Sequence, residues 1–298
     1  MQRILVPGRN GQVGWELQGA LAPLGTVIGL DRSGMDLTSP DSIRRAIRDA
    51  QPDVIVNAAA YNNVDRAESE PDLAMKVNGV APGIIAEEAK RLGAVLIHFS
   101  TDYVFDGERE RPYVEDDPPN PVNAYGRSKL AGEQAVAAVG GQHLILRTSW
   151  VYSARGSNFV LTVLRLAREK PELSMVNDQS GSPTWARVLA EATAELLRRK
   201  ELISRHSGVY HCAAGGHTSR FELANAIIGI MQDVSGSPCG WAKVRPITTD
   251  QYPLPARRPR HPVMNKDKAR RVLGVEMTHW QDALRSCLAG LATTIATR

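Results

Sequence analysis

The sequence predicts an α/β protein with a Rossmann-like, doubly wound parallel sheet and a smaller C-terminal α/β domain. Through the first 150 residues, short apolar runs of strand length alternate with longer segments of helical periodicity. A glycine-rich turn joins the first strand to the first helix, as it does in dinucleotide-binding proteins. We therefore expect a nucleotide-binding domain over residues 1–150 and a second domain over residues 151–298.

The composition is that of a soluble globular protein and excludes several other classes. Of the 298 residues, 43% are hydrophobic and 23% are charged, which suits one large α/β unit or two unequal domains. The net charge of +4 is dispersed, and the tight basic runs at 198–200 and 257–260 carry no interleaved aromatic residues. We therefore expect no nucleic-acid partner.

Cysteine usage and the first residues indicate the compartment. Cys212, Cys239 and Cys287 are odd in number and lack C-x-x-C spacing, so we expect a reducing compartment without a disulfide or a zinc site. The chain enters an apolar strand at Ile4 without a signal peptide, and no apolar run reaches the length of a membrane span. A cytoplasmic protein without membrane contact is expected.

The first strand and the turn after it form a candidate pyrophosphate site. Residues 4–6 are an apolar run typical of a buried strand. Gly8, Gly11 and Gly14 follow with G-x-x-G-x-x-G spacing, before an amphipathic helix over residues 15–21. Glycines let the backbone approach a ligand closely, and the helix N-terminus supplies amide donors and the positive end of its dipole.

The second strand, over residues 27–30, ends in an acidic residue. Asp31 lies about 20 residues after the glycines, where a carboxylate accepts hydrogen bonds from the adenosine ribose. Arg9 and Arg32 are placed where they could instead pair with a 2′-phosphate. The sequence therefore leaves both NADPH and NADH open as the cofactor.

Residues after the second and third strands are further candidates for cofactor contact. Asp36 and Leu37 either line the adenine site or form only a turn and cap before the helix over residues 42–49. The third strand, over residues 53–57, runs into small side chains that leave room for a cofactor at its carboxyl end. These small residues are Ala58, Ala59 and Ala60.

Two further strands bring polar side chains to the same edge of the sheet. The strand over residues 95–99 is followed by Thr101, whose hydroxyl should face the crevice at the strand ends. His98 lies within that strand and is expected to be a packed core residue. The strand over residues 143–148 leads to Trp150. We expect six strands in all within the first 150 residues.

Tyr125 and Lys129 form the candidate catalytic pair. At four residues apart on the predicted helix over residues 125–139, they share one helix face and lie about 6 Å apart along its axis. An ammonium about 4 Å from a phenol would favour the phenolate by roughly 4 kcal/mol at an effective dielectric near 20, an upper bound of about three pKa units. We therefore expect Lys129 to lower the pKa of Tyr125 and make it an acid for a carbonyl oxygen.

With the glycine turn, Thr101 and the Tyr-x-x-x-Lys pair in this order, the chain resembles the extended short-chain dehydrogenases/reductases. Within that group it most resembles the family of dTDP-4-dehydrorhamnose reductases, over nearly its whole length. Together the matching segments are specific, whereas any one alone is not. They are residues 11–17, 56–61, 67–71, 100–105, 125–126, 129–133, 147–152, 177–179, 181–184 and 255–259.

The resemblance implies a reaction and a set of roles. NADPH or NADH would reduce the 4-keto group of the sugar nucleotide dTDP-4-dehydro-β-L-rhamnose, giving dTDP-β-L-rhamnose. Tyr125 would donate the proton, Lys129 would hold the nicotinamide ribose, and Thr101 would hydrogen-bond the carbonyl oxygen. The matching cofactor positions are Gly11, Gln12, Val13, Asp31, Asp36, Leu37, Ala60, Tyr61 and Asn62.

For the sugar nucleotide, the resemblance implies contacts with Thr101, Asp102 and Trp150. Trp150 would form an apolar wall against the deoxysugar or belong to the ordinary core. Arg257 and Arg258 suit a pyrophosphate, because guanidinium binds phosphate bidentately, or they belong to a solvated basic loop.

In the C-terminal part, the sequence predicts a strand over residues 208–213 and helices over 158–169, 185–200, 218–231 and 278–291. We expect the helix over 185–200 to pack back on the N-terminal domain.

Two alternative functions share this scaffold. An epimerase or dehydratase with tightly held NAD is disfavoured, since dehydratases usually place Thr-Asp-Glu where this chain has Thr101, Asp102 and Tyr103. The other is an NADP-binding regulatory subunit of a methionine adenosyltransferase. Arg187 stands where some family members carry an acidic residue that binds a divalent cation together with the one matching Glu16. We therefore expect no metal site, although a homodimer stays open.

Overall fold

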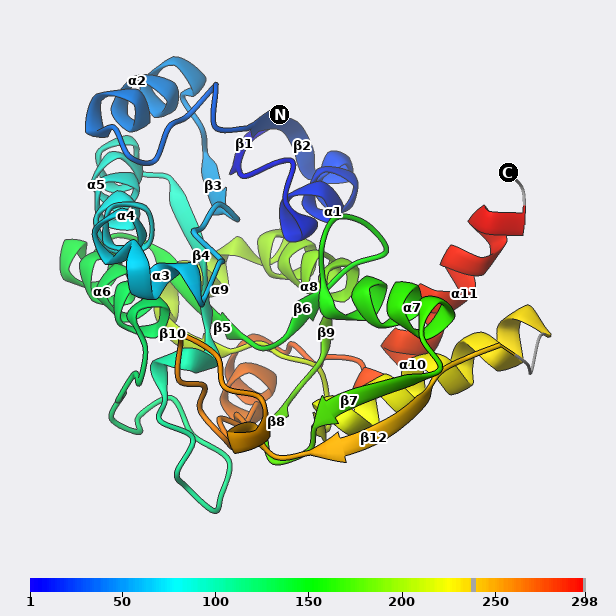
Figure 1. Cartoon of the computed structure of the whole chain (residues 1–298). Helices are drawn as coiled ribbons and strands as arrows, with labels where there is room; N and C mark the ends of the chain where they lie inside the picture. Colours follow the sequence, from blue (N-terminus) through cyan, green and yellow to red (C-terminus); the bar gives the residue numbers. More distant parts are fainter. Residues whose placement is uncertain (237–239, 297–298) are drawn as a thin grey trace.

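A six-stranded parallel sheet forms the centre of the N-terminal part (Figure 1). The computed structural model describes residues 1–236 and 240–296. The strand order β10-β5-β4-β3-β1-β2 places β1 between β2 and β3, so the chain changes direction across the sheet next to the glycine turn. The strands are β1 (Gln2–Pro7), β2 (Gly25–Leu30), β3 (Val54–Asn57), β4 (Val95–Thr101), β5 (His143–Thr148) and β10 (Gly208–His211). The predicted doubly wound fold is confirmed.

Helices cover both faces of the sheet because successive side chains of each buried strand point to opposite faces. Ile4 and Val6 share one core cluster with Leu17 and Leu189, whereas Leu5 belongs to a second cluster with Ile47. Figure 1 shows α1 and α8 on one side of the sheet and α2, α5 and α6 on the other. The helices are α1 (Gln12–Leu21), α2 (Pro40–Ala50), α5 (Ala81–Leu92), α6 (Ala124–Val139) and α8 (Ala186–Arg198).

The expectation of six strands within the first 150 residues is wrong. That part of the chain contributes five strands, and the sixth, β10, comes from the C-terminal part and pairs in parallel with β5. Helix α8 returns to the sheet with it, as predicted, and packs against α1. The edge of β5 offers unpaired backbone N–H and C=O groups, and β10, about 60 residues further on, pairs with them.

The C-terminal part has a separate apolar core. It joins Val163, Leu173, Ile227 and Leu284, which come from three helices and one strand. The helices are α7 (Phe159–Glu169), α10 (Arg220–Ser235) and α11 (Trp280–Ala296), and all three were predicted with boundaries shifted by a few residues. The short parallel pair β7 (Glu172–Val176) and β12 (Lys243–Ile247) was missed.

The remaining elements are short. They are α3 (Arg66–Ser69), α4 (Pro71–Met75), α9 (Lys200–Arg205), β6 (Val151–Tyr152), β8 (Ser180–Gly181), β9 (Thr184–Trp185), β11 (Thr218–Ser219), η1 (Ala22–Leu24), η2 (Lys76–Val80), η3 (Asp102–Val104), η4 (Thr249–Gln251) and η5 (Ala269–Leu273).

The structure bears on the expectations for the cysteines and for membrane-spanning helices. Cys212 and Cys287 are free and buried, while Cys239 lies outside the described residues. Within residues 1–236 and 240–296, no helix combines the length and the apolarity that crossing a membrane requires.

The return of α8 to the sheet gives a stability prediction. Leu189 is fully buried in the cluster that contains Ile4 and Val6, so Leu189→Ala should lower the free energy of unfolding by about 2–5 kcal/mol. Glu191→Ala on the same helix is the matched control, because its carboxylate is 59% exposed and its ion pair with Arg187 should contribute under about 1 kcal/mol. Urea unfolding measures both. Similar costs for the two variants would contradict this packing of α8.

Candidate active site

Three adjoining cavities run across the carboxyl ends of the strands. The N-terminal cavity, of about 460 Å³, contains Asp31 and Leu37, and the central cavity, of about 390 Å³, contains Thr101 and Tyr125. These two share Gly11, Ala58, Ala59, Ala60 and Asn62. The C-terminal cavity, of about 1440 Å³, meets the central one at Phe159 and Arg220. A ligand in either outer cavity can therefore reach the central one.

The glycine turn brings α1, β1 and the end of β3 into close contact. Gly8 has a left-handed φ of 84°, and a Cβ there would lie 2.7 Å from the backbone nitrogen of Ala59. Because Gly11 has no side chain to cap α1, the first amides of the helix stay available to an anion. Gln12 and Val13, at this N-terminus, line the central cavity. The predicted pyrophosphate site is therefore geometrically suited to a dinucleotide.

The residues predicted to contact adenosine surround the N-terminal cavity. Arg9 pairs with Asp31 at 3.2 Å, and the Ser33 hydroxyl donates to the same carboxylate at 2.6 Å. These hydrogen bonds lower the pKa of Asp31, chiefly through Ser33. Arg32 lies over the exposed edge, 3.9 Å from Asp36. A carboxylate and two guanidinium groups thus meet where a ribose with or without a 2′-phosphate would bind.

Asn78 holds the loop after β3 against α6. Its side chain accepts the backbone N–H of Tyr61 at 2.8 Å and donates to the Tyr61 carbonyl at 2.9 Å and to the Ser128 hydroxyl at 3.1 Å. Asn78 belongs to η2, a π-helical turn between α4 and α5. The sequence analysis assigned it no role, although a buried amide that binds both the N–H and the C=O of one residue is a positioning device.

Tyr125 and Lys129 are placed by the packing of α6 on the ends of β4. A Cβ on Gly126 would lie 2.2 Å from the Tyr103 carbonyl oxygen, so only glycine lets the first turn of α6 come this close. One turn later, Lys129 is buried, and its Nζ donates to the Phe99 carbonyl at 2.6 Å. Both side chains line the central cavity with Thr101, as predicted.

The direction of the Tyr125 pKa shift differs from the expectation. Burial raises the pKa of Tyr125, and its hydrogen bond to Thr101 opposes this rise only in part. The net shift is therefore opposite to the one expected from Lys129, whose ammonium donates to the Phe99 carbonyl. Burial also lowers the pKa of Lys129 to about 8, against the influence of Glu133. Tyr125 therefore keeps its proton at neutral pH and can act as a donor.

Asp102 is a buried carboxyl whose two oxygens both have partners within the protein. Oδ1 accepts from the Thr101 hydroxyl at 3.0 Å, and Oδ2 accepts from the Ser149 hydroxyl at 2.6 Å. Burial raises the pKa of Asp102 to about 6, and the Ser149 and Thr101 hydrogen bonds moderate this rise. Ser149 was missed in the sequence, although it carries the same signal as Thr101, a hydroxyl after a strand at the carboxyl edge.

Trp150 lines the central cavity and also packs against the C-terminal core. Its φ of 44° is left-handed, which a bulky residue rarely adopts, and such strained residues often occur at functional sites. The Arg220 guanidinium lies 3.6 Å from the centroid of its ring. Nothing in the sequence indicated Arg220, which starts α10 some 70 residues further along.

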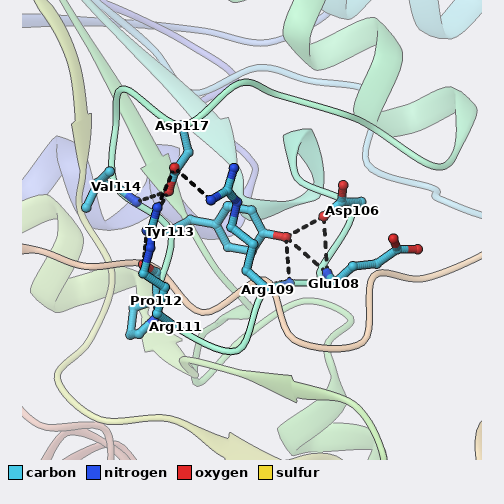
Figure 2. Close-up of polar contacts among 8 residues, drawn as sticks. All are labelled: Asp106, Glu108, Arg109, Arg111, Pro112, Tyr113, Val114 and Asp117. Carbon is cyan, nitrogen blue, oxygen red and sulfur yellow. Dashed lines mark hydrogen bonds and ion pairs between the residues drawn. The ribbon is translucent and has the colours of Figure 1, made fainter.

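The loop after β4 borders the C-terminal cavity. Figure 2 shows the Tyr113 hydroxyl between the carboxylate of Asp106, to which it donates a hydrogen bond, and the backbone amides of Glu108 and Arg109. At the cavity mouth, Glu108 pairs with the exposed Arg257 at 3.2 Å. The loop thus forms a hydrogen-bonded rim of the cavity.

Arg257 and Arg258 differ in their surroundings although both line the C-terminal cavity. Arg258 makes two hydrogen bonds of 2.7 Å to the carboxylate of Asp65, which fixes its guanidinium. The Arg257 side chain is mostly exposed and pairs with Glu108 at the surface. Arg257 is therefore the more available of the two for an incoming phosphate.

The structure also shows the surroundings of Arg187, the residue considered above for a metal site. Arg187 pairs with Glu191 at 3.1 Å on the exposed face of α8. Among the residues that the structure describes, no group of three or more His, Cys, Asp or Glu side chains is arranged to hold a metal ion. His98 is buried, hydrogen-bonded to Asn57 at 3.1 Å, and burial lowers its pKa, which confirms the packed core histidine.

Comparison with known proteins assigns the family. Residues 1–293 match the family described as RmlD substrate binding domain. The dTDP-4-dehydrorhamnose reductase of Burkholderia thailandensis is 48% identical over 294 residues, which cover 97% of this chain and 99% of the relative.

Two solved structures agree with this assignment. A dTDP-4-dehydrorhamnose reductase of Clostridium acetobutylicum matches with a TM-score of 0.89 and 35% identity, and one of Bacillus anthracis, in complex with NADP, with 0.87 and 34%. Each match covers 97% of this chain and 99% of the other. The chain therefore belongs to the family of dTDP-4-dehydrorhamnose reductases.

Proposed function

We propose that this protein reduces the 4-keto group of dTDP-4-dehydro-β-L-rhamnose to dTDP-β-L-rhamnose, the last step of dTDP-L-rhamnose biosynthesis. It is an oxidoreductase that uses NADPH or NADH. The observation that carries the proposal is the convergence of Thr101, Tyr125 and Lys129 on the central cavity, which lies between the N-terminal and the C-terminal cavity. The keto carbon would lie in this central cavity.

The residues that line the N-terminal and central cavities suit a dinucleotide coenzyme. The pyrophosphate would lie against the N-terminus of α1 at Gln12 and Val13, and the adenosine against Asp31 and Leu37. Lys129, in the wall of the central cavity, would hold the nicotinamide ribose. When bound, the reduced nicotinamide supplies a hydride for the carbonyl carbon.

Tyr125 provides the proton for the carbonyl oxygen. Burial keeps its pKa above the ordinary value, so the phenol is protonated at neutral pH and donates as negative charge develops on the oxygen. Thr101 holds the phenol by a hydrogen bond. In the structure the Thr101 hydroxyl donates to Asp102, so we assign Thr101 to orienting Tyr125 rather than to donating directly to the substrate.

The rest of the substrate would extend into the C-terminal cavity. Its volume of about 1440 Å³ suits a nucleoside diphosphate, and Arg257 at its mouth offers an exposed guanidinium for the phosphates. Trp150 and Phe159 would flank the deoxysugar from the central cavity.

The proton role of Tyr125 gives the first test of this function. Tyr125→Phe should lower kcat at least about a hundredfold, because general-acid catalysis contributes on that order, while coenzyme binding persists. The assay follows loss of absorbance of NADPH or NADH with the keto sugar nucleotide. Tyr210→Phe is the matched control, since it removes a buried phenol hydroxyl that donates to His206, away from the cavities. Turnover by Tyr125→Phe at the wild-type rate would rule out this role.

The pairing of Arg9 with Asp31 gives a test of coenzyme choice. Arg9→Gln leaves the Asp31 carboxylate without its guanidinium, so a 2′-phosphate beside it would be repelled. The KM for NADPH should rise about fivefold to tenfold, and the KM for NADH should change little. Arg44→Gln, which removes a partly exposed arginine of α2 that pairs with Glu87 of α5, serves as the control. An equal change for both coenzymes would show that Arg9 does not face the 2′ position.

A further inference from the structure

We propose that Asp102 supplies the proton that restores Tyr125, through the hydroxyl of Thr101, and that Ser149 sets the proton affinity of this carboxyl. This inference rests on the proposed reduction, which consumes one proton per turnover. The path consists of three neighbouring groups: the Tyr125 phenol hydrogen-bonded to Thr101, Thr101 at 3.0 Å from Asp102, and Asp102 at 2.6 Å from Ser149.

The Thr101 hydroxyl has the partners that a relay needs. A hydroxyl has one proton to donate and two lone pairs to accept. One lone pair of Thr101 accepts the backbone N–H of Tyr103 at 3.1 Å in a fixed geometry. The proton and the other lone pair serve Asp102 and Tyr125, one on each side. The hydroxyl can therefore face either way between these two groups without losing a hydrogen bond.

The protonation state of Asp102 decides the direction in which the hydrogen bonds between Asp102, Thr101 and Tyr125 are donated. With Asp102 ionised, Thr101 donates to the carboxylate and Tyr125 donates to Thr101, so the phenol proton points away from the substrate. With Asp102 protonated, the carboxyl donates to Thr101, Thr101 donates to the phenol oxygen, and the Tyr125 proton is free to face the cavity. Only the protonated form thus presents the acid to a carbonyl oxygen.

The proton balance closes over one turnover. Tyr125 gives its proton to the carbonyl oxygen, whose carbon receives the hydride. The resulting phenolate takes the Thr101 proton, and Thr101 takes the proton of the Asp102 carboxyl. Asp102 is then a carboxylate, and because it lines the central cavity, water that enters after product release returns the proton.

The surroundings of Asp102 suit this exchange. Its side chain is 1% exposed, and burial raises its pKa to about 6, near enough to neutrality for both forms to be accessible. The charged and titratable groups that face it are Arg220 from α10, Tyr103 from η3 and Tyr125 from α6. From the end of β5, the Ser149 hydrogen bond stabilises the ionised form.

The pH dependence of kcat tests the relay. Since the protonated carboxyl is the active form, kcat of the wild type should fall as pH rises through the pKa of Asp102, near 6. Ser149→Ala removes a hydrogen bond that favours the carboxylate, so the fall should move to higher pH, by about one unit. Asp102→Asn should abolish the fall of kcat with rising pH and lower kcat about tenfold, because an amide cannot pass on a proton.

The assay uses the whole chain with saturating coenzyme and keto sugar nucleotide, from pH 5 to 9, and urea unfolding confirms that each variant is folded. Ser149→Ala keeps the test decisive if Asp102→Asn does not fold. An unshifted profile in Ser149→Ala, or the same fall in Asp102→Asn, would overturn the relay. Absence of any coenzyme oxidation by the wild type would instead refute the proposed reduction itself.

Discussion

The register of β4 against β5 is the constraint on which the site depends. Thr101 pairs with Thr148 at the ends of these parallel strands, so the residues that follow, Asp102 and Ser149, leave the sheet side by side. A slip of one residue would turn each side chain to the opposite face and separate the carboxyl from its hydroxyl partner. The register thus fixes a polar cluster that neither strand could form alone.

Helix α6 is fastened to the same two strands. Lys129 donates to the Phe99 carbonyl of β4, and Glu133, one turn later, forms a buried two-hydrogen-bond pair with Arg147 of β5. Breaking such a buried pair leaves an uncompensated charge, so it strongly favours one arrangement once formed. Tyr125 at the start of α6 therefore reaches the cavity in a defined position relative to Thr101.

Local patterns in the sequence predicted those parts of the site whose residues lie close together along the chain. The glycine turn, the alanines after β3 and the spacing of Tyr125 and Lys129 each lie within one strand–turn–helix unit, and each lines its expected cavity. The pKa shift of Tyr125 could not be predicted in the same way. Spacing gives the distance along a helix, but it reveals neither burial nor the competing Phe99 carbonyl.

The missed features depend on contacts between distant segments. β10 pairs with β5 across about 60 residues of sequence, and Arg220 at the start of α10 lies over the ring of Trp150 across about 70. β12 escaped prediction because Pro246 and two basic residues interrupt its apolar pattern.

The most direct test of the central claim follows the hydride itself. The enzyme would be incubated with the keto sugar nucleotide and NADPH or NADH carrying deuterium at the transferable position, and the product examined by NMR. We expect deuterium at C4 of the sugar, bonded to the carbon of the former carbonyl. A product without deuterium, or with deuterium at another carbon, would contradict the assignment of the central cavity to 4-keto reduction.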